Sequence, residues 1–210
     1  MIPKIRVQGF KSSGSSKLLI NLGITSHIVN MTSSTHSTEH DDLRKKDPHI
    51  HRPVVSIAAP SIELLNKIKD TKDVLDSFEI PYSVSIVAAH RAPRKTLRYI
   101  DQLESKGIEV IIACGSGSAH LPGMIASLTS IPVIGIPLVS NHLGGIDSVL
   151  SMLQMPEGVP VATVGISSAY NAAIIACQIL SLKYHHLKDM IRSHKNMLEQ
   201  NVELEDSTAN

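Results

Sequence analysis

The feature that most constrains the fold is a series of short apolar runs that alternate with segments of helical spacing. The runs are VVSIAA (54–59), YSVSIVAA (82–89), EVIIAC (109–114), PVIGIPLV (132–139) and VPVATVGI (159–166). Continuous apolar runs are typical of strands that are covered on both faces. Such strands, alternating with helices, predict a parallel sheet with right-handed crossover connections.

Helical patterns fill the intervals between these runs. The first, over 63–78, places these apolar residues on one face: Leu64, Leu65, Ile68, Leu75 and Phe78. A second begins at Pro93, where a first helical turn tolerates proline, and a third is expected over 119–129. The last spans about Ala169 to Tyr184 and continues or restarts to about Gln200. We therefore predict a three-layer α/β domain with a flavodoxin-like parallel sheet and a long C-terminal helix.

The first 52 residues differ in composition from the rest. Residues 1–38 are rich in Ser and Thr, contain Lys and Arg, and lack Asp and Glu, whereas 39–52 are dominated by charge and His. Neither part has sustained apolar periodicity, so we expect residues 1–52 to be a mostly disordered extension. The domain itself is expected over 53–183, followed by a C-terminal helix and tail over 184–210.

Three alternatives remain open for the extension. Its acid-free start resembles an organellar transit peptide. The others are an unstructured extension and a translation start at Met31. The residues His36, His40, His49 and His51 lack Cys partners and helical spacing, which favours a solvated tail over a metal site.

Charge and composition exclude several classes of protein. The net charge is +1 and the chain has no Trp, two Phe and four Tyr, which argues against nucleic-acid binding. Cys114 and Cys177 lie far apart in apolar runs, which indicates reduced thiols inside a cell. The best candidate for a membrane span, Ala169–Leu182, is too short. We expect a cytoplasmic protein without membrane partners, or an organellar one if residues 1–38 direct import.

In open parallel sheets, ligands bind beyond the carboxyl ends of the strands. Four segments should meet there: AAPSIE (58–63), AAHRAP (88–93), CGSGSAHLPG (114–123) and LVSNHLGGIDS (138–148). Three of them contain a histidine, namely His90, His120 and His142. Histidine exchanges protons near neutral pH, so these segments predict an acid–base site at this edge.

The pair His90–Arg91 and the glycine-rich turn carry the candidate chemistry. Arg91 presents a planar fork suited to phosphate, and His90 beside a bound anion can cycle a proton. The alternative is a helix-entry turn with solvated polar residues. Gly115 and Gly117 let the backbone approach a ligand, and the next helix start offers amide donors to an anion. The turn matches neither a P-loop nor G-x-G-x-x-G.

AAHRAP, AHLPGM (119–124) and SNHLGGIDSVLSMLQMPEGVPVATVGI (140–166) together resemble the PurE family of purine biosynthesis. The resemblance runs over about 130 residues and continues through NAAIIACQIL (171–180). It implies a three-layer α/β fold, a homo-octamer with active sites at subunit contacts, and a ribonucleotide substrate. The form with HLPGM is a 5-(carboxyamino)imidazole ribonucleotide mutase, which shifts the carboxyl from the exocyclic nitrogen to a ring carbon. No metal or organic cofactor is implied.

The resemblance assigns roles to matching positions. His90 corresponds to the catalytic histidine that moves the proton, and His120 to the second active-site histidine. Arg91 corresponds to the phosphate-binding arginine. The remaining positions line the pocket for the base and the carboxyl group: Ala89, Gly117, Ser118, Ala119 and Leu121.

The loop at 59–63 departs from the family pattern G-S-x-S-D. Aligned without gaps, Ala59 and Pro60 stand at the first two positions, and Pro60 offers neither a hydroxyl nor an amide donor. Ile62 replaces a hydroxyl, and Glu63 keeps a carboxylate for the ribose one methylene further out. Three alternatives follow. The chain is a mutase that binds with Arg91, Glu63 and backbone amides, aided by Ser61; a non-catalytic or regulatory paralogue; or an enzyme acting on a different nucleotide.

Overall fold

The computed structural model of the chain describes residues 7–12, 15–21, 26–30 and 50–209. The chain forms two compact units, one within residues 1–46 and the other within 47–210. No helix in the described ranges combines the length and the apolar character that a membrane span requires.

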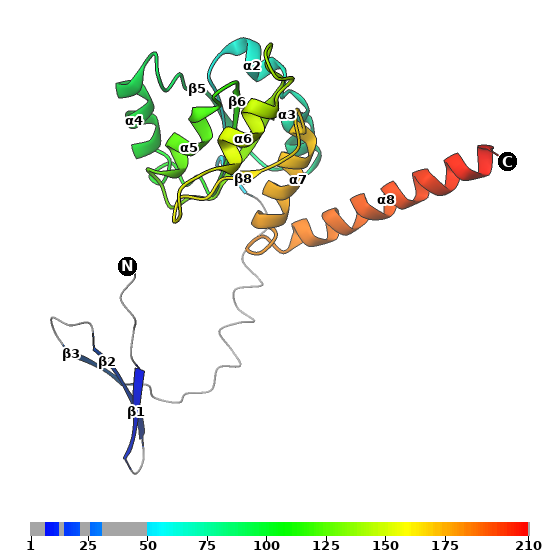
Figure 1. Cartoon of the computed structure of the whole chain (residues 1–210). Helices are drawn as coiled ribbons and strands as arrows, with labels where there is room; N and C mark the ends of the chain where they lie inside the picture. The colour runs from blue at the N-terminus through cyan, green and yellow to red at the C-terminus, as the bar shows by residue number, and fades with distance from the viewer. Residues whose placement is uncertain (1–6, 13–14, 22–25, 31–49, 210) are drawn as a thin grey trace. The chain divides into compact units, whose positions relative to one another are not determined.

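The first unit contains an antiparallel sheet of three strands, β1 (Val7–Ser12), β2 (Ser15–Asn21) and β3 (Ser26–Asn30), in the order β1-β2-β3 (Figure 1). Our expectation of disorder therefore differs from the structure in these segments. The sequence Leu18–Ile20 and the pair Ile28–Val29 are β-prone, and pairing between segments needs no long periodic run within one of them. The candidate start Met31 and three of the four histidines, His36, His40 and His49, lie outside the described residues.

The second unit is built on a parallel sheet in the order β5-β4-β6-β7-β8. Its strands are β4 (Val55–Ala59), β5 (Tyr82–Ile86), β6 (Val110–Ser116), β7 (Val133–Leu138) and β8 (Ala162–Thr163). This order is the flavodoxin-like one, so the predicted fold class is confirmed. β8 is much shorter than the run expected over 159–166. Pro160 has no amide hydrogen for the ladder, which restricts pairing at its start.

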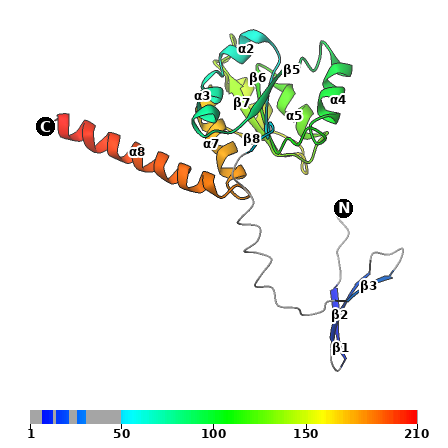
Figure 2. The same cartoon turned by 180° about the vertical axis from the view of Figure 1, so that it is seen from behind.

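Seven helices connect and cover the strands of this unit within residues 50–209. They are α2 (Ile62–Asn66), α3 (Asp70–Ser77), α4 (Pro93–Asp101), α5 (His120–Ala126), α6 (Ile146–Leu153), α7 (Ala169–Leu180) and α8 (His186–Ala209). The helix expected over 63–78 is thus two helices separated by a turn at 67–69. Helix α6 was not predicted. The C-terminal helix restarts at His186 and extends away from the sheet (Figures 1 and 2).

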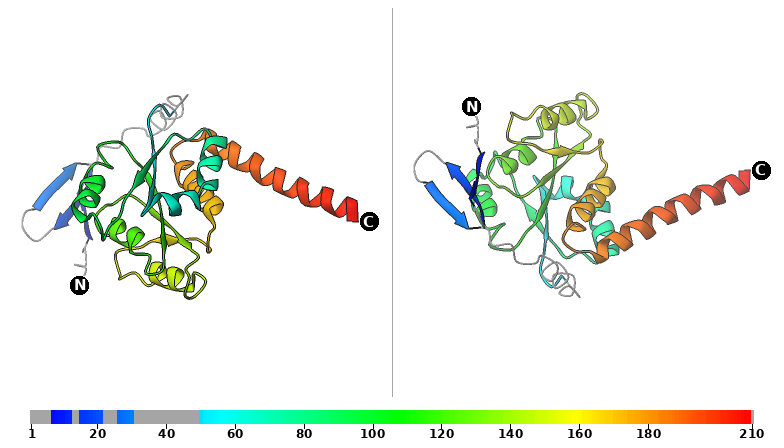
Figure 3. Two further views of the ribbon diagram at one scale, coloured as in Figure 1. Left: turned by 90° about the horizontal axis from the view of Figure 1, so that it is seen from above. Right: turned by 90° about the horizontal axis from the view of Figure 1, so that it is seen from below.

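The side chains of each central strand point alternately to the two faces of the sheet and pack into two hydrophobic cores. In β6, Ile112 and Cys114 pack toward α3 and α7, whereas Ile111 and Ala113 pack toward α4 and α5. Figure 3 shows the sheet between these helical layers. A fully buried Ile of this kind contributes about 1.5–3 kcal/mol to folding. The rigid sheet therefore fixes where the loops at the carboxyl ends of the strands begin.

The turn before α6 depends on Gly145. Its φ is +99°, and a Cβ there would lie 3.0 Å from Cγ2 of Ile166 and 3.3 Å from the carbonyl oxygen of Leu138. Gly144 also has a positive φ, +60°, but a Cβ there would meet no atom within 4 Å. We expect Gly145→Ala to lower the free energy of unfolding by about 2–4 kcal/mol, and Gly144→Ala by only about 1–2 kcal/mol. Urea unfolding of the two variants measures the difference. Equal losses would show that the contact with Ile166 does not constrain the turn.

Candidate active site

Two histidines meet at the carboxyl ends of the strands. His90 lies in the loop after β5, and His120 is the first residue of α5, after β6. Nε2 of His90 lies 2.9 Å from Nδ1 of His120, and the rings meet edge to face with their centroids 4.8 Å apart. One ring nitrogen must donate a proton and the other accept it. Both side chains are exposed to solvent, so the pair can exchange a proton with a bound molecule.

The backbone before α5 holds His120 in place. Ala119 adopts the left-handed conformation, with φ +43° and ψ +37°. A Cβ on Gly115 would lie 2.9 Å from Cα of Ala119, so the chain folds back tightly against Gly115. Leu121 is buried in the core below the helix. Its side chain therefore anchors α5 and leaves only its backbone for a ligand.

Arg91 lies over the loop that follows β4. One Nη2 hydrogen donates to the carbonyl oxygen of Pro60 at 2.8 Å. The guanidinium has five N–H donors, and the side chain is exposed, so donors remain for an anion. The neighbouring Ala89 is buried and packs in the core.

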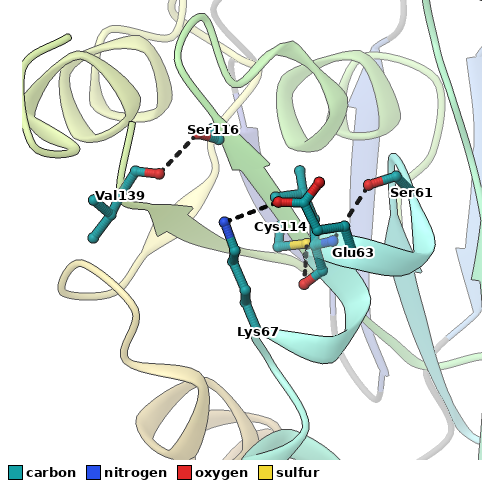
Figure 4. Close-up of polar contacts among 7 residues, drawn as sticks. Ser61, Glu63, Lys67, Cys114, Ser116 and Val139 are labelled. Atoms are coloured by element: carbon teal, nitrogen blue, oxygen red, sulfur yellow. Dashed lines mark hydrogen bonds and ion pairs between the residues drawn. The ribbon is translucent and has the colours of Figure 1, made fainter. Parts of the chain in front are cut away.

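A cleft of about 250 Å³ lies beside α2, which follows this loop. It is lined by Glu63, Leu64, Lys67, Ser116, Gly117, Val139, Ser140, Asn141 and His142. The third predicted histidine therefore lines this cleft. Figure 4 shows Glu63 of α2 and Lys67, the residue that caps the end of α2, next to the end of β6. The carboxylate of Glu63 and the ammonium of Lys67 form an ion pair at 3.3 Å.

The glycine turn is held by α6. The amide of Gly117 donates to Oγ of Ser148 at 2.9 Å, and Oγ of Ser151 donates to the carbonyl oxygen of Gly117 at 3.2 Å. The Gly117 amide is therefore occupied by the Ser148 hydroxyl. A Cβ at Gly117 would meet no atom within 4 Å, so the space in front of it is open. Ser118, next in the turn, is exposed.

The loop at 59–63 begins one residue later than the sequence indicated. Ala59 belongs to β4 and is fully buried, so it cannot contact a ligand with its side chain. Oγ of Ser61 accepts a hydrogen bond from the amide of Leu64 at 3.3 Å and caps α2 (Figure 4). Its hydroxyl hydrogen stays available as a donor. Glu63 is the acidic residue of the first turn of α2.

Both cysteines are free and buried, as predicted. Burial raises the pKa of each thiol, Cys114 and Cys177, to about 12. Sγ of Cys114 lies 4.0 Å from the carbonyl oxygen of Leu64 (Figure 4). The thiols therefore stay protonated at neutral pH and are not nucleophiles.

Sequence reasoning missed three polar residues around the site. Lys67 follows Glu63 by four residues on a helix, a spacing that predicts an ion pair. Ser148 and Asp147 open α6, and the hydrogen bond from Oγ of Ser140 at 2.7 Å holds the pKa of the Asp147 carboxyl below its usual value. No group of three or more possible metal ligands occurs in the part of the chain that the structure describes.

Comparisons with known proteins match most of the chain. A family model described as AIR carboxylase matches residues 54–201. The N5-carboxyaminoimidazole ribonucleotide mutase of Pyrococcus horikoshii is 46% identical over 152 residues, which cover 72% of this chain and 86% of that protein. The phosphoribosylaminoimidazole carboxylase of Schizosaccharomyces pombe is 49% identical over 139 residues, 66% of this chain and 25% of that protein.

A solved structure gives the same result for the fold. The crystal structure of Treponema denticola PurE superposes with a TM-score of 0.69 at 25% sequence identity. The superposition covers 75% of this chain and 98% of that one. The likeness therefore extends over nearly the whole of the solved chain.

Proposed function

Because the chain belongs to the AIR carboxylase family, we propose that it converts 5-(carboxyamino)imidazole ribonucleotide to 4-carboxy-5-aminoimidazole ribonucleotide in purine biosynthesis. The observation that carries this proposal is the pair His90–His120, joined at 2.9 Å at the carboxyl ends of the strands. The family's reaction needs one proton that can be delivered and recovered. A histidine pair of this kind supplies it.

The proton balance assigns the role of His90. Cleavage of the bond between the exocyclic nitrogen and the carboxyl carbon releases carbon dioxide and places a proton on that nitrogen. The ring carbon then attacks carbon dioxide and loses its own proton. One group can perform both transfers with no net change, and we assign them to His90. His120 holds the ring of His90 in position and shares its proton.

The loops around the pair provide binding groups. In our proposal, Arg91 binds the phosphate with its remaining N–H donors. Glu63 binds the ribose hydroxyls, and the hydroxyl of Ser61 adds a donor. Further pocket positions keep water away from the released carbon dioxide: Ala89, Gly117, Ser118, Ala119 and the backbone of Leu121. None of these steps requires a metal or an organic cofactor.

A labelled substrate tests the reaction directly. The purified full-length protein is mixed with substrate that carries 13C in its carbamate carboxyl, and the product is followed by 13C NMR. We expect the label to move to the ring carboxylate. Aminoimidazole ribonucleotide with bicarbonate serves as the comparison for direct carboxylation. No transfer of label, together with no heat on titration at millimolar substrate, would refute the proposal.

A non-catalytic paralogue is the second candidate, and the loop after β4 favours it. Pro60 has no N–H donor, and Ile62 places an apolar side chain, 67% exposed, where the family pattern has a hydroxyl. Ala59 also departs from the family pattern, but it is buried in β4 and cannot contact the phosphate with its side chain. The test of the loop is therefore the single substitution Pro60→Ser. If the wild-type protein binds substrate weakly and Pro60→Ser tightens binding, the loop is the defect. Turnover of another nucleotide, with none of this substrate, would instead indicate a changed specificity.

Exposed apolar residues support contact between copies of the chain, and we propose that the assembly is a homo-octamer. The outer side of α6 and the turn before it expose Leu143 (59%), Ile146 (57%), Leu150 (48%) and Leu153 (59%). Ile146, Leu150 and Leu153 follow one another by a helical turn, so they form one apolar stripe. Contiguous exposed apolar surface of this kind marks protein interfaces. We propose that α6 packs against another copy of the chain.

Charge on this stripe should break the assembly. We expect Leu150→Asp to shift the protein to smaller species, because the carboxylate would be buried without a partner. Leu128→Asp is the matched control, since Leu128 is also 48% exposed but lies after α5. Light scattering after size-exclusion chromatography gives the mass of each. An unchanged mass for Leu150→Asp would remove α6 from the interface.

We also propose a cytoplasmic location, or a mitochondrial or plastid one if residues 1–38 direct import. The two free, buried cysteines fit a reducing compartment. A fusion of residues 1–52 to a fluorescent protein, imaged in cells, separates the two locations.

A further inference from the structure

A second cleft lies away from the histidine pair, between α4 and β5. Its volume is about 530 Å³, roughly twice that of the cleft beside Glu63. It is lined by Val84, Ser85, Ile86, Val87, Lys95, Arg98, Tyr99, Gln102 and Lys106. A volume of this size falls within the range of small-molecule sites.

All the charged side chains that line this cleft are positive. Lys95, Arg98 and Lys106 line it, and no Asp or Glu does. Among residues 50–206, the ion pairs involve other cations, and none joins these three to a carboxylate. The whole chain carries a net charge of only +1, so three uncompensated cations in one hollow are a local concentration of charge. Their mutual repulsion is relieved when an anion binds between them.

Tyr99, which lines the cleft, is tied to the sheet behind it by a chain of hydroxyl groups. The hydroxyls of Ser56 and Tyr99 form a hydrogen bond at 2.8 Å, and Oγ of Ser83 donates to Oγ of Ser56 at 3.2 Å. Ser83 and Ser85 alternate with Val84, so both lie on the face of β5 toward α4. Small side chains there leave a hollow where a doubly covered sheet ordinarily packs large apolar ones.

The spacing of the cations indicates the kind of anion. Lys95 and Arg98 are one turn apart on α4, about 5 Å along its axis. Lys106 comes after the end of the helix at Asp101, further along the same cleft. A single phosphate reaches only part of such a row, whereas linked phosphate groups reach all of it.

We propose that this cleft is a second binding site, for a small molecule that carries two or more linked phosphate groups. Lys95, Arg98 and Lys106 bind the phosphates, and Gln102 adds a neutral donor. The hydroxyl chain from Ser83 through Ser56 holds the side chain of Tyr99 in place at the wall of the cleft. The site is separate from His90 and Arg91, so it does not rest on the function proposed above.

Calorimetric titration of the full-length protein with inorganic tripolyphosphate tests the site. We expect tripolyphosphate to bind at least about tenfold more tightly than orthophosphate at equal ionic strength. Arg98→Gln and Lys106→Gln should each weaken it about tenfold or more, as expected for a lost charge-assisted contact. Arg94→Gln is the matched control, because Arg94 is exposed on the same helix but does not line the cleft. Arg91→Gln removes the phosphate contact proposed for the active site, so tripolyphosphate binding that persists in this variant belongs to the cleft.

Three results would overturn the proposal. The first is the absence of tripolyphosphate binding in the wild-type protein, which would mean that the cations form an ordinary solvated face. The second is an equal loss of affinity in Arg94→Gln and Arg98→Gln, which would mean that the attraction is general to α4. The third is a change in assembly mass in Arg98→Gln without any effect on tripolyphosphate, which would mean that the cleft receives another protein chain. Circular dichroism of each variant confirms that the fold is retained.

Discussion

His90→Asn should lower kcat for the carboxyl shift by about 10²–10⁴-fold, the range that a positioned acid–base group contributes. Asparagine stays polar, but its amide reaches only as far as Nδ1 of the imidazole, so it also loses the contact that Nε2 of His90 makes with His120. It cannot take up and release a proton near neutral pH. We therefore expect the substrate Kd to change only a few-fold while the transfer of 13C label stops. Turnover and calorimetric affinity, measured on the same preparation, separate the two effects.

Two further variants make this result specific. His120→Asn can keep an amide where Nδ1 of His120 faced His90, but it loses the imidazole that shares the proton, so it should also reduce kcat. His185→Asn is the control, since His185 is exposed in the turn before α8. Full activity of His90→Asn together with loss of activity in His120→Asn would exchange the two roles.

The sequence predicted the sheet well because its signal is local. Each strand is a continuous apolar run, and the right-handed crossover rule limits how such strands can be ordered. Helix α6 was not predicted, although Ile146, Leu150 and Leu153 follow helical spacing, and its apolar stripe faces outward instead of into the domain core. The separation of α2 from α3 also escaped, since the apolar residues on both sides of the turn at 67–69 keep helical spacing.

The candidate site was predictable in position but not in geometry. The chain order places His90 and His120 after strands β5 and β6, and the carboxyl ends of parallel strands lie at one edge. Their contact depends on the left-handed Ala119, which has no sequence signal of its own. Likewise, the Gly117 amide is occupied by Ser148, 31 residues away. Such partners follow from tertiary packing and not from spacing along the chain.

Arg91→Gln should raise the substrate Kd about 100-fold or more, with a much smaller effect on kcat. Each charge-assisted hydrogen bond to a phosphate contributes about 1.5–3 kcal/mol, and arginine can form two at once. This loss of affinity should be larger than in a protein with the family pattern G-S-x-S-D, whose loop supplies further donors to the phosphate. In this chain Pro60 offers no N–H, so more of the affinity depends on Arg91. Arg91→Lys keeps the charge without the planar fork, so its substrate Kd should lie between those of the wild-type protein and Arg91→Gln. Calorimetric titration gives the three affinities.

The size of this loss also distinguishes the two functional candidates. If the protein is an active mutase, Arg91 supplies much of the phosphate affinity, and Pro60→Ser in the Arg91→Gln background should recover part of it. If it is a non-catalytic paralogue, the wild-type protein already binds weakly, and Arg91→Gln has little affinity left to remove. An Arg91→Gln variant that binds as tightly as the wild-type protein would show that the phosphate lies elsewhere. The guanidinium would then serve only to hold the Pro60 carbonyl, at 2.8 Å, and so the loop after β4.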